Sequence, residues 1–419
     1  MKKYLLIFTL MILNTGISSA QENPAELKKL ESELREDLEN HILPFWSNKM
    51  ADNKNGGFYG RMDGFNKLYP DAVRGGILNA RILWTFSASF RVLKDSSYLK
   101  VAEHAMDYIL DKFIDREYGG AFLSVTAEGE PADVRKQTYT QAFFIYALSE
   151  YYLATGDSLA LDEAKNIFQC VEKYCSDPVN NGYFEVYSRD WEKTDDLLIG
   201  EKDKNDQKTM NTHLHLLEAY TNLYRAWPDE IVASRLKNLI ELFTRKIIDQ
   251  KTGHLIVFLN EKWESTSTLN SYGHDIEASW LLEESANVLG DAGLIAQVRH
   301  LSIQIVHAAE EGLQPDGSLI YEKDIATGHA YTNRDWWPQA EAITGFVKAY
   351  KLTGDKAYLA KARKCWDYVD KRMVDHRNGE WFNSISEKGE VNKHGDKAGF
   401  WKCPYHNSRM CLEMIEMAE

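Results

Sequence analysis

The sequence is short of cysteine and proline for a chain of its length. Of its 419 residues, 5 are cysteine and 9 are proline. The cysteines are odd in number, and no pair has the spacing of a metal finger, which excludes a disulfide framework and a zinc finger. We expect all five to be buried as small apolar side chains. They are Cys170, Cys175, Cys365, Cys403 and Cys411.

Positive charge is also scarce. The chain has 63 Asp and Glu against 49 Lys and Arg, which gives a formal net charge of −14. A chain this acidic is a poor partner for nucleic acid or for an anionic membrane. Beyond the first 20 residues there is no long apolar run either, so we expect a soluble mature protein without a membrane partner.

The N-terminus differs from the rest of the chain. Two lysines precede an apolar run over residues 4–13, and a stretch of small residues ends at Ala20. This layout is typical of a secretory signal peptide and is too short to span a bilayer well. We therefore expect residues 1–20 to be removed and residues 21–419 to be periplasmic or secreted. Removal of the two lysines would take the net charge from −14 to −16.

A glycine followed by apolar or small residues recurs six times, at intervals of 63, 62, 71, 64 and 62 residues. Before each glycine lies an amphipathic helical pattern, and after it a second helical pattern with fewer charges and more aromatics. The glycines are Gly57, Gly120, Gly182, Gly253, Gly317 and Gly379, and the second helices are predicted at 74–93, 138–154, 210–226, 273–289, 337–352 and 404–418.

Six pairs of an outer amphipathic helix and an inner apolar helix close naturally into a ring. The pattern therefore predicts one all-α domain, an (α/α)6 barrel with short β-like segments in the loops at one rim. Gly-Asp turns after several inner helices, at Gly156, Gly290 and Gly354, support these boundaries. An open solenoid of twelve helices is the alternative, but neither end shows a polar capping repeat.

Polar and aromatic residues gather near the start of every predicted inner helix. Because these positions should meet at one rim, they indicate a single converging site. The set is Arg74; Tyr139; Asn211, His213 and His215; Tyr272, His274 and Glu277; Trp336, Trp337, Gln339 and Glu341; and Trp401, Tyr405 and His406.

Several of these residues also have a purely structural interpretation. Arg74 could cap a helix or pair with an acid, and His274 with Glu277 could form a buried ion pair. His213 and His215 are two apart on a helix and cannot face one metal ion, so we expect no metal and place only His215 in the site. A glycosidase would need two carboxylates such as Glu277 and Glu341, whereas a histidine pair fits proton abstraction beside a carbonyl better.

Four motifs together identify a family. The segments MNTHLHLLEAY, GHDIEASWLL, WWPQAEA and FWKCPYHN resemble the N-acylglucosamine 2-epimerase superfamily, and within it the cellobiose 2-epimerases. The resemblance covers about residues 25–418. It implies the same (α/α)6 barrel, and a cofactor-free inversion at C2 of the reducing-end sugar of a β-1,4-linked disaccharide such as cellobiose, lactose or mannobiose.

The resemblance also implies roles for single residues. His274 and His406 match the acid/base histidines, and Glu277 matches the partner of the first. Arg74, Tyr139, Asn211 and His215 match the positions that bind substrate and intermediate. Trp337 and Trp401 match aromatic residues that stack on sugar rings, and Glu341 is expected to contribute to substrate binding.

Three other functions stay open at this point. An epimerase or aldose–ketose isomerase for monosaccharides or N-acylglucosamine would use the same histidines. A glycoside hydrolase or a non-catalytic sugar-binding protein could use the same barrel. The charged segment 189–208 is either a solvated surface loop or a lid. We expect a monomer or a weak homodimer.

Overall fold

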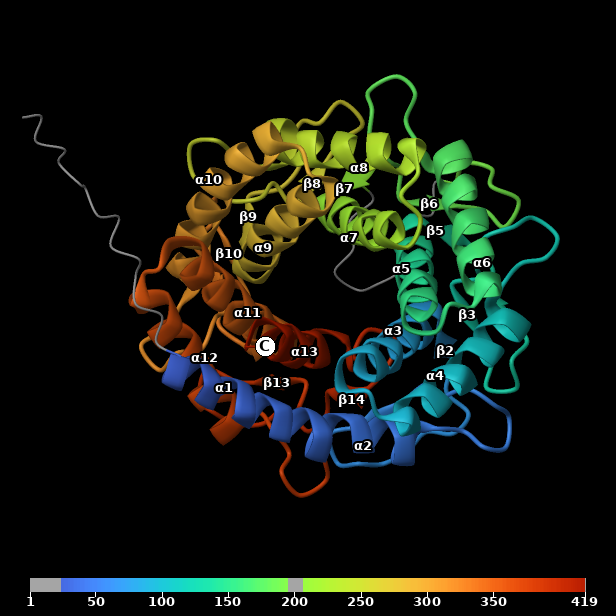
Figure 1. Cartoon of the computed structure of the whole chain (residues 1–419), viewed down its shortest axis with the longest axis horizontal. Helices are drawn as coiled ribbons and strands as arrows, with labels where there is room; N and C mark the ends of the chain where they lie inside the picture. The colour runs from blue at the N-terminus through green and yellow to red at the C-terminus, as the bar shows by residue number, and fades with distance from the viewer. Residues whose placement is uncertain (1–23, 195–205, 419) are drawn as a thin grey trace, which may run out of the picture.

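The computed structural model describes residues 24–194 and 206–418, and its inner helices form a closed ring (Figure 1). Each inner helix packs against the next, and the last packs against the first. This closure confirms the (α/α)6 barrel and rules out the open solenoid. The inner helices are α3 (Gly76–Leu93), α5 (Thr138–Thr155), α7 (Met210–Ala226), α9 (Tyr272–Leu289), α11 (Trp336–Thr353) and α13 (Tyr405–Ala418).

The outer helices surround this ring, each packed on an inner helix. They are α1 (Pro24–Asp37), α4 (Ser96–Tyr108), α6 (Ser158–Cys170), α8 (Glu230–Leu242), α10 (Ala292–Ala309) and α12 (Lys356–Arg372). The first continues through η1 (Leu38–Ile42), α2 (Leu43–Phe45) and η2 (Trp46–Met50), and Pro44 in this stretch cannot donate a helical hydrogen bond. Other outer helices end in η3 (Ile109–Phe113), η4 (Val171–Cys175), η5 (Phe243–Ile247) and the 3₁₀ turn η6 (Glu310–Gly312).

Helix ends agree closely with the sequence prediction. Gly156, Gly290 and Gly354 each adopt a left-handed conformation, with φ of 76°, 78° and 74°, and stop an inner helix. The aspartate that follows each glycine then caps the next outer helix through its carboxylate. The prediction of 74–93 starts two residues early, because Arg74 and Gly75 pair with a neighbouring strand before the helix begins.

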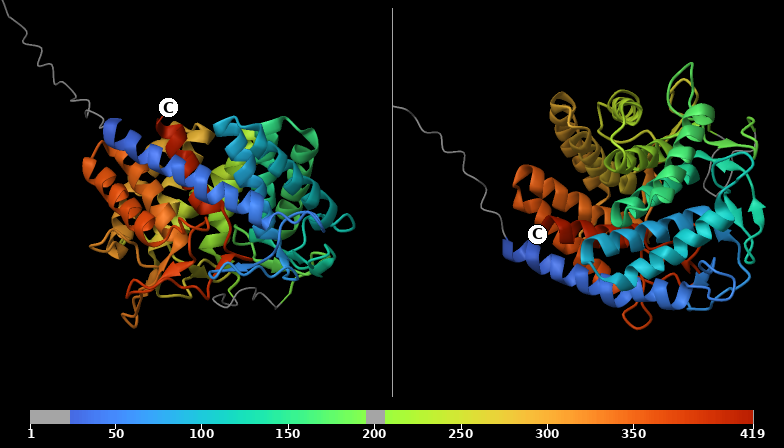
Figure 2. Two further views of the ribbon diagram at one scale, coloured as in Figure 1. Left: turned by 90° about the horizontal axis from the view of Figure 1, so that it is seen from below. Right: turned by 45° about the vertical axis from the view of Figure 1, so that its right-hand side comes forward.

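Short strands pair between neighbouring repeats at one end of the barrel (Figure 2). In most of these pairs, the strand that leads into one inner helix pairs with a strand from the loop of an adjacent repeat, so a belt of separate small sheets surrounds the rim. The pairs are β1 (Met62–Asp63) with β14 (Asp396–Ala398); β2 (Arg74–Gly75), β3 (Ser124–Val125) and β4 (Pro131–Asp133); β5 (Lys136–Gln137) with β6 (Val186–Tyr187); β7 (Lys208–Thr209) with β8 (Phe258–Leu259); β9 (Leu269–Ser271), β10 (Glu322–Asp324) and β11 (Ala330–Tyr331); and β12 (Arg334–Asp335) with β13 (Ser384–Ile385).

The structure corrects the alignment of the six repeats by one residue. Equivalent residues are those that form a bridge back to the end of the outer helix, and in the first three repeats each follows one of the expected glycines. In the last three repeats, however, the residue before the bridge is His254, Ser318 or Glu380, and the glycine lies one position earlier. The bridging residues are Phe58, Ala121, Tyr183, Leu255, Leu319 and Trp381.

Three further expectations concern single features. All five cysteines are unpaired; four are buried and Cys170 is half-buried. Among the described helices, none combines the length and apolar character that crossing a bilayer would require. The proposed signal peptide, residues 1–20, lies outside the described residues, as do residues 195–205 of the charged segment, so the choice between a surface loop and a lid stays open.

Candidate active site

The candidate site lies at the strand-bearing end of the barrel, where the inner helices begin. His274 is in the first turn of α9, and His406 is the second residue of α13. Each helix follows directly on a rim segment, so the belt of strands determines where its first turn starts. This arrangement brings residues from distant repeats to one place on the barrel axis.

His406 is almost fully buried and rests on two carboxylates. Its Nδ1 lies 2.7 Å from Oε1 of Glu341 and 3.8 Å from Oε1 of Glu277. Burial, followed by the nearby positive charges of Arg81 and Arg409, lowers the pKa of His406 well below its ordinary value. His406 is therefore a neutral imidazole at neutral pH, able to accept a proton.

His274 is half-buried and has a different environment. Its Nδ1 lies 2.7 Å from the hydroxyl of Ser271, at the end of strand β9. Its ring is 4.6 Å from the ring of Trp337, and the ring of His406 is 5.5 Å from the same indole. Both histidines thus border a single tryptophan, close enough to act on one small ligand.

His215 and His213 have the separate roles that their spacing predicts. Nδ1 of His215 lies 2.9 Å from Oε2 of Glu218, and burial lowers the pKa of this histidine. His213 instead bonds the backbone, with Nε2 accepting from the N–H of Tyr183 at 3.0 Å and Nδ1 lying 2.7 Å from the carbonyl of Thr209. Only His215 belongs to the candidate site.

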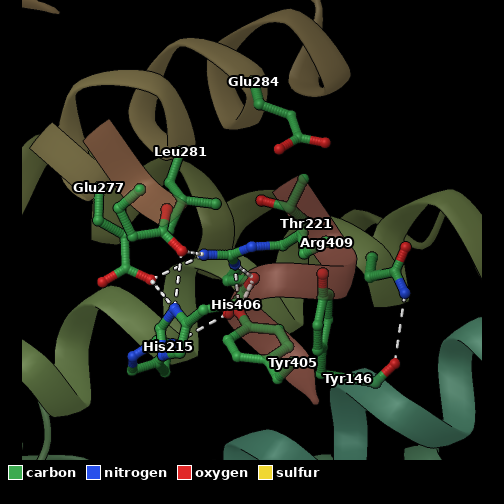
Figure 3. Close-up of polar contacts among 12 residues, drawn as sticks. Tyr146, His215, Thr221, Glu277, Leu281, Glu284, Tyr405, His406 and Arg409 are labelled. Carbon is green, nitrogen blue, oxygen red and sulfur yellow. Dashed lines mark hydrogen bonds and ion pairs between the residues drawn. The ribbon is translucent and has the colours of Figure 1, made fainter. Parts of the chain in front are cut away.

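Glu277 contacts residues of α13, whereas the resemblance pairs it with His274. Its Oε1 accepts a 2.8 Å hydrogen bond from Arg409 and faces His406 (Figure 3). Ser271 bonds His274. Burial, and next the negative charge of Glu341, raises the pKa of Glu277 well above its usual value. The carboxylate therefore belongs to the group beneath His406.

Glu341 is likewise bound by protein groups and not free for a sugar. Its Oε1 accepts from Arg409 at 2.7 Å, and its Oε2 accepts from the indole N–H of Trp280 at 3.1 Å. Ligand atoms of Glu277, Glu341 and His406 all lie within 4.8 Å of one another, which is close enough for a metal ion. Arg409, however, already places a cation between the two carboxylates.

Arg74 is a correction to the sequence prediction. Its guanidinium donates a 2.5 Å hydrogen bond to Asp52 and another to the carbonyl of Gly56, and both side chains of the ion pair are fully buried. Lys136, Lys208 and Lys397 make the corresponding ion pairs in other repeats. Arg74 therefore holds a rim loop, because it occupies the position of these structural cations.

The arginine that reaches the site is Arg81, one and a half turns into α3. It donates to the hydroxyl of Tyr139 at 2.8 Å and to the carbonyl of Trp401 at 3.4 Å. Its guanidinium also lies over the ring of Phe143, 4.1 Å from the centroid. Burial raises the pKa of Tyr139 to about 12, so this hydroxyl keeps its proton.

The other expected binding residues border the same region. Asn211 has a buried side-chain oxygen that accepts no hydrogen bond from the described residues, which leaves it available to a ligand. Trp401 lies 6.1 Å from the ring of Tyr139, and 37% of its surface is exposed. An exposed aromatic face beside polar groups suits a sugar ring, whose C–H groups stack on it.

The sequence prediction misses Arg81, Phe143 and Arg409, which a simple pattern could have found. Four inner helices carry a buried polar side chain that accepts the N–H of the bridging residue: Gln141, His213, Asp275 and Gln339. The residue two positions later on each helix points to the barrel axis. With the matching positions of α3 and α13, these residues form the axial cluster, namely Arg81, Phe143, His215, Glu277, Glu341 and Arg409, all buried.

The chain is similar to known proteins over most of its length. The model of the family described as N-acylglucosamine 2-epimerase (GlcNAc 2-epimerase) matches residues 57–408. The cellobiose 2-epimerase of Bacteroides fragilis is 48% identical over 386 residues, covering 92% of this chain and 98% of the relative. That of Ruminococcus albus is 40% identical over 385 residues, again covering 92% and 98%.

A solved structure is similar over the same span. The cellobiose 2-epimerase from Bacillus thermoamylovorans superposes with a TM-score of 0.89 at 44% sequence identity. The match covers 93% of this chain and 100% of that one.

Proposed function

Because the chain belongs to the N-acylglucosamine 2-epimerase family and is an isomerase of the cellobiose 2-epimerase type, we propose that it inverts C2 of the reducing-end sugar of a β-1,4-linked disaccharide. Cellobiose would become glucosyl-mannose, lactose would become epilactose, and mannobiose would become mannosyl-glucose. The observation that carries this proposal is the placement of His274 and His406 beside one indole, that of Trp337.

The reaction begins with opening of the sugar ring, since only the aldehyde makes the C2 proton acidic. One histidine then removes that proton and leaves a cis-enediolate, and the second histidine protonates the opposite face of C2. His274 on α9 and His406 on α13 supply these two groups. Proton transfers of this kind need no cofactor, so the proposed reaction is cofactor-free.

The negative charge that develops on O1 requires fixed donors. The structure favours Arg81 over Arg74 for this task, because Arg81 contacts Tyr139 and the backbone of Trp401 whereas Arg74 is engaged by Asp52. We assign His215 to the same end of the sugar. Asn211 provides a free amide oxygen for a hydroxyl group.

Trp337 and Trp401 are assigned to the two sugar rings. Trp337 borders both histidines and would stack on the reacting unit. Trp401 is more exposed, as a platform for a second unit would be. This pair supports a disaccharide over a monosaccharide as substrate.

The decisive experiment is incubation with cellobiose in heavy water. We expect a product one mass unit heavier, with the label at C2 and no cleavage of the disaccharide. Release of monosaccharides would instead support a hydrolase, and an unlabelled, unchanged disaccharide would leave only a binding function. Product analysis with mannobiose, glucose, mannose and N-acetylglucosamine separates disaccharide from monosaccharide epimerases and isomerases.

Replacing either histidine tests the residue assignment. We expect His274→Ala and His406→Ala each to lower kcat by several orders of magnitude while the circular dichroism spectrum stays unchanged. Near-normal turnover in both variants would refute it.

Two proposals about the setting of this activity rest on the sequence alone. Residues 1–20, which lie outside the described residues, support export to the periplasm or medium, and mass spectrometry of the mature N-terminus tests it. A monomer or weak homodimer stays our expectation, to be measured by analytical ultracentrifugation.

A further inference from the structure

The two most deeply buried histidines of the site share one unusual feature. In both, Nδ1 is held by a carboxylate, Glu218 for His215 and Glu341 for His406, at 2.9 and 2.7 Å. One arginine, Arg409, joins these carboxylates, with Nη1 donating to Glu218 and Nη2 donating to Glu341 (Figure 3). Arg409 also pairs with a third acid, Glu277. The three acids and the two histidines come from four different inner helices.

This arrangement determines which nitrogen of His215 carries the proton. An ionised carboxylate can only accept hydrogen bonds, so Nδ1 must donate and Nε2 of the neutral ring keeps its lone pair. Burial alone would raise the pKa of Glu218, but Arg409, His215 and Tyr405 outweigh it and lower the pKa to about 2. Glu218 is therefore ionised throughout the neutral range.

The orientation of the Glu218 carboxylate is also fixed. Its Oε1 accepts from both the hydroxyl of Tyr405 and the guanidinium of Arg409, while its Oε2 faces His215. All of these groups are buried. The two donors at Oε1 fix the orientation of the acid, and the acid in turn fixes the orientation and protonation of the imidazole.

We propose that Glu218, Tyr405 and Arg409 are positioning residues that present Nε2 of His215 to the sugar as a proton acceptor, so that His215 is the base for ring opening. This inference rests on the proposed function. His215 takes the O1 proton as C1=O1 forms, the C1–O5 electron pair moves to O5, and the imidazolium form of His274 protonates O5, because His406 is neutral. His274, which is half-buried, then regains a proton from solvent. The imidazolium of His215 then donates back to O1 when negative charge develops there.

The sharpest test is Glu218→Gln. Tyr405 and Arg409 both donate at the Oε1 position, so the glutamine must place its carbonyl oxygen there and its NH₂ against His215. That forces the opposite tautomer, with hydrogen on Nε2, without changing shape. By analogy with carboxylate-to-amide changes beside catalytic histidines elsewhere, we expect kcat to fall by about 100-fold or more, with KM changed by less than about threefold.

A substrate-free measurement separates this inference from the proposed function. Long-range ¹H–¹⁵N NMR of protein labelled with ¹⁵N-histidine reports the tautomer, and His215→Asn assigns the signal. We expect hydrogen on Nδ1 in the wild type and on Nε2 in Glu218→Gln. The Nε2–H tautomer in the wild type, or a folded Glu218→Gln variant with kcat within about threefold of wild type, would overturn the proposal even if the protein epimerises sugars.

Tyr405→Phe is the milder variant, in case Glu218→Gln does not fold. Losing one donor leaves more negative charge facing His215, which favours the imidazolium and shifts the acidic limb of the kcat/KM profile to higher pH. We expect this shift together with about a tenfold lower kcat. An unchanged profile and kcat would show that the hydroxyl of Tyr405 serves packing alone, against the proposal.

The chain offers a matched control in Tyr220→Phe. The hydroxyl of Tyr220 also donates to a glutamate, Glu172, at 2.7 Å, and the ring is fully buried on α7, the helix that carries Glu218. Glu172 belongs to an outer helix segment, η4, and its other partners are Tyr183 and Arg235. We expect a loss of stability similar to that of Tyr405→Phe, with kcat and its pH profile unchanged. A matching shift of the acidic limb in this control would overturn the proposal.

Discussion

Replacing Arg74 with methionine tests whether this arginine holds a loop or acts on the substrate. Its guanidinium and the carboxylate of Asp52 are 2.5 Å apart, and neither side chain is exposed to solvent. Breaking a buried ion pair by removing one partner costs about 3–5 kcal/mol. Asp52 keeps hydrogen bonds from Lys54 and Asn55, so we expect the lower end, about 3 kcal/mol.

The same magnitude can be expressed as a melting temperature. Unfolding entropy of about 2.1 cal/mol/K per residue gives about 0.9 kcal/mol/K for a chain of this length. A loss of about 3 kcal/mol therefore lowers the Tm by about 3 °C. Differential scanning calorimetry measures this shift, and we expect kcat for cellobiose at 25 °C to stay within about twofold of the wild type.

Arg81→Met is the matched comparison. Its guanidinium bonds a tyrosine hydroxyl, a backbone carbonyl and, weakly, the sulfur of Cys403, so its removal leaves no unpaired buried carboxylate. We expect a small change in Tm and a fall in kcat of about 100-fold or more, the usual cost of losing one donor to an oxyanion. The assignment of Arg81, and not Arg74, to the substrate would be refuted by two results together. These are a stable Arg74→Met variant whose kcat falls about 100-fold and an Arg81→Met variant that stays active.

Three other changes give separate outcomes. Burial alone would raise the pKa of Asp115, but hydrogen bonds from Arg189 and Lys136 lower it to about 2, below its value in the unfolded chain. Ionised Asp115 therefore adds about 2 kcal/mol to the free energy of unfolding above pH ~4, and this contribution is lost as the pH falls toward 2. Urea unfolding of Asp115→Asn should therefore show a larger deficit at pH 7 than at pH 3, and equal deficits would contradict this. Trp401→Ala should raise KM for cellobiose about tenfold, with kcat within threefold, because an exposed stacking contact is worth about 1.4 kcal/mol; a change in kcat alone would show that Trp401 does not bind the second sugar. Gln339→Leu leaves the N–H and carbonyl of Leu319 unpaired and should cost about 3 kcal/mol in calorimetry, whereas a Tm within 1 °C of wild type would disprove this role.

The helices were predictable because their signals are local. Apolar periodicity and the Gly-Asp turns placed the ends of the inner helices within two residues of the observed ones, and the six-fold repeat indicated a closed ring. The separation of His213 from His215 was also predictable, since residues two apart on a helix point in different directions. Neither inference needed knowledge of long-range contacts.

Errors arose where two residues of similar type compete for one role. Arg74 and Arg81 lie on the same sequence segment, and the resemblance favours Arg74, which is nearer the expected rim. What distinguishes them is Asp52, which lies in the loop after the first outer helix and takes Arg74 out of the site. The resemblance pairs Glu277 with His274 on the same helix, but the contacts of Glu277 include Arg409 and His406 on another.

By itself, the sequence determined the number of repeats, the alternation of outer and inner helices, and the residue types available at the rim, because each of these follows from periodicity along the chain. The tertiary structure alone decided which side chains meet. The axial cluster takes one residue from each of six helices, spaced about 60 to 70 residues apart in the sequence. Its protonation states depend on burial and on charges from neighbouring helices. Closure of the ring brings Arg409 between three carboxylates, and no local pattern encodes a contact across the barrel axis.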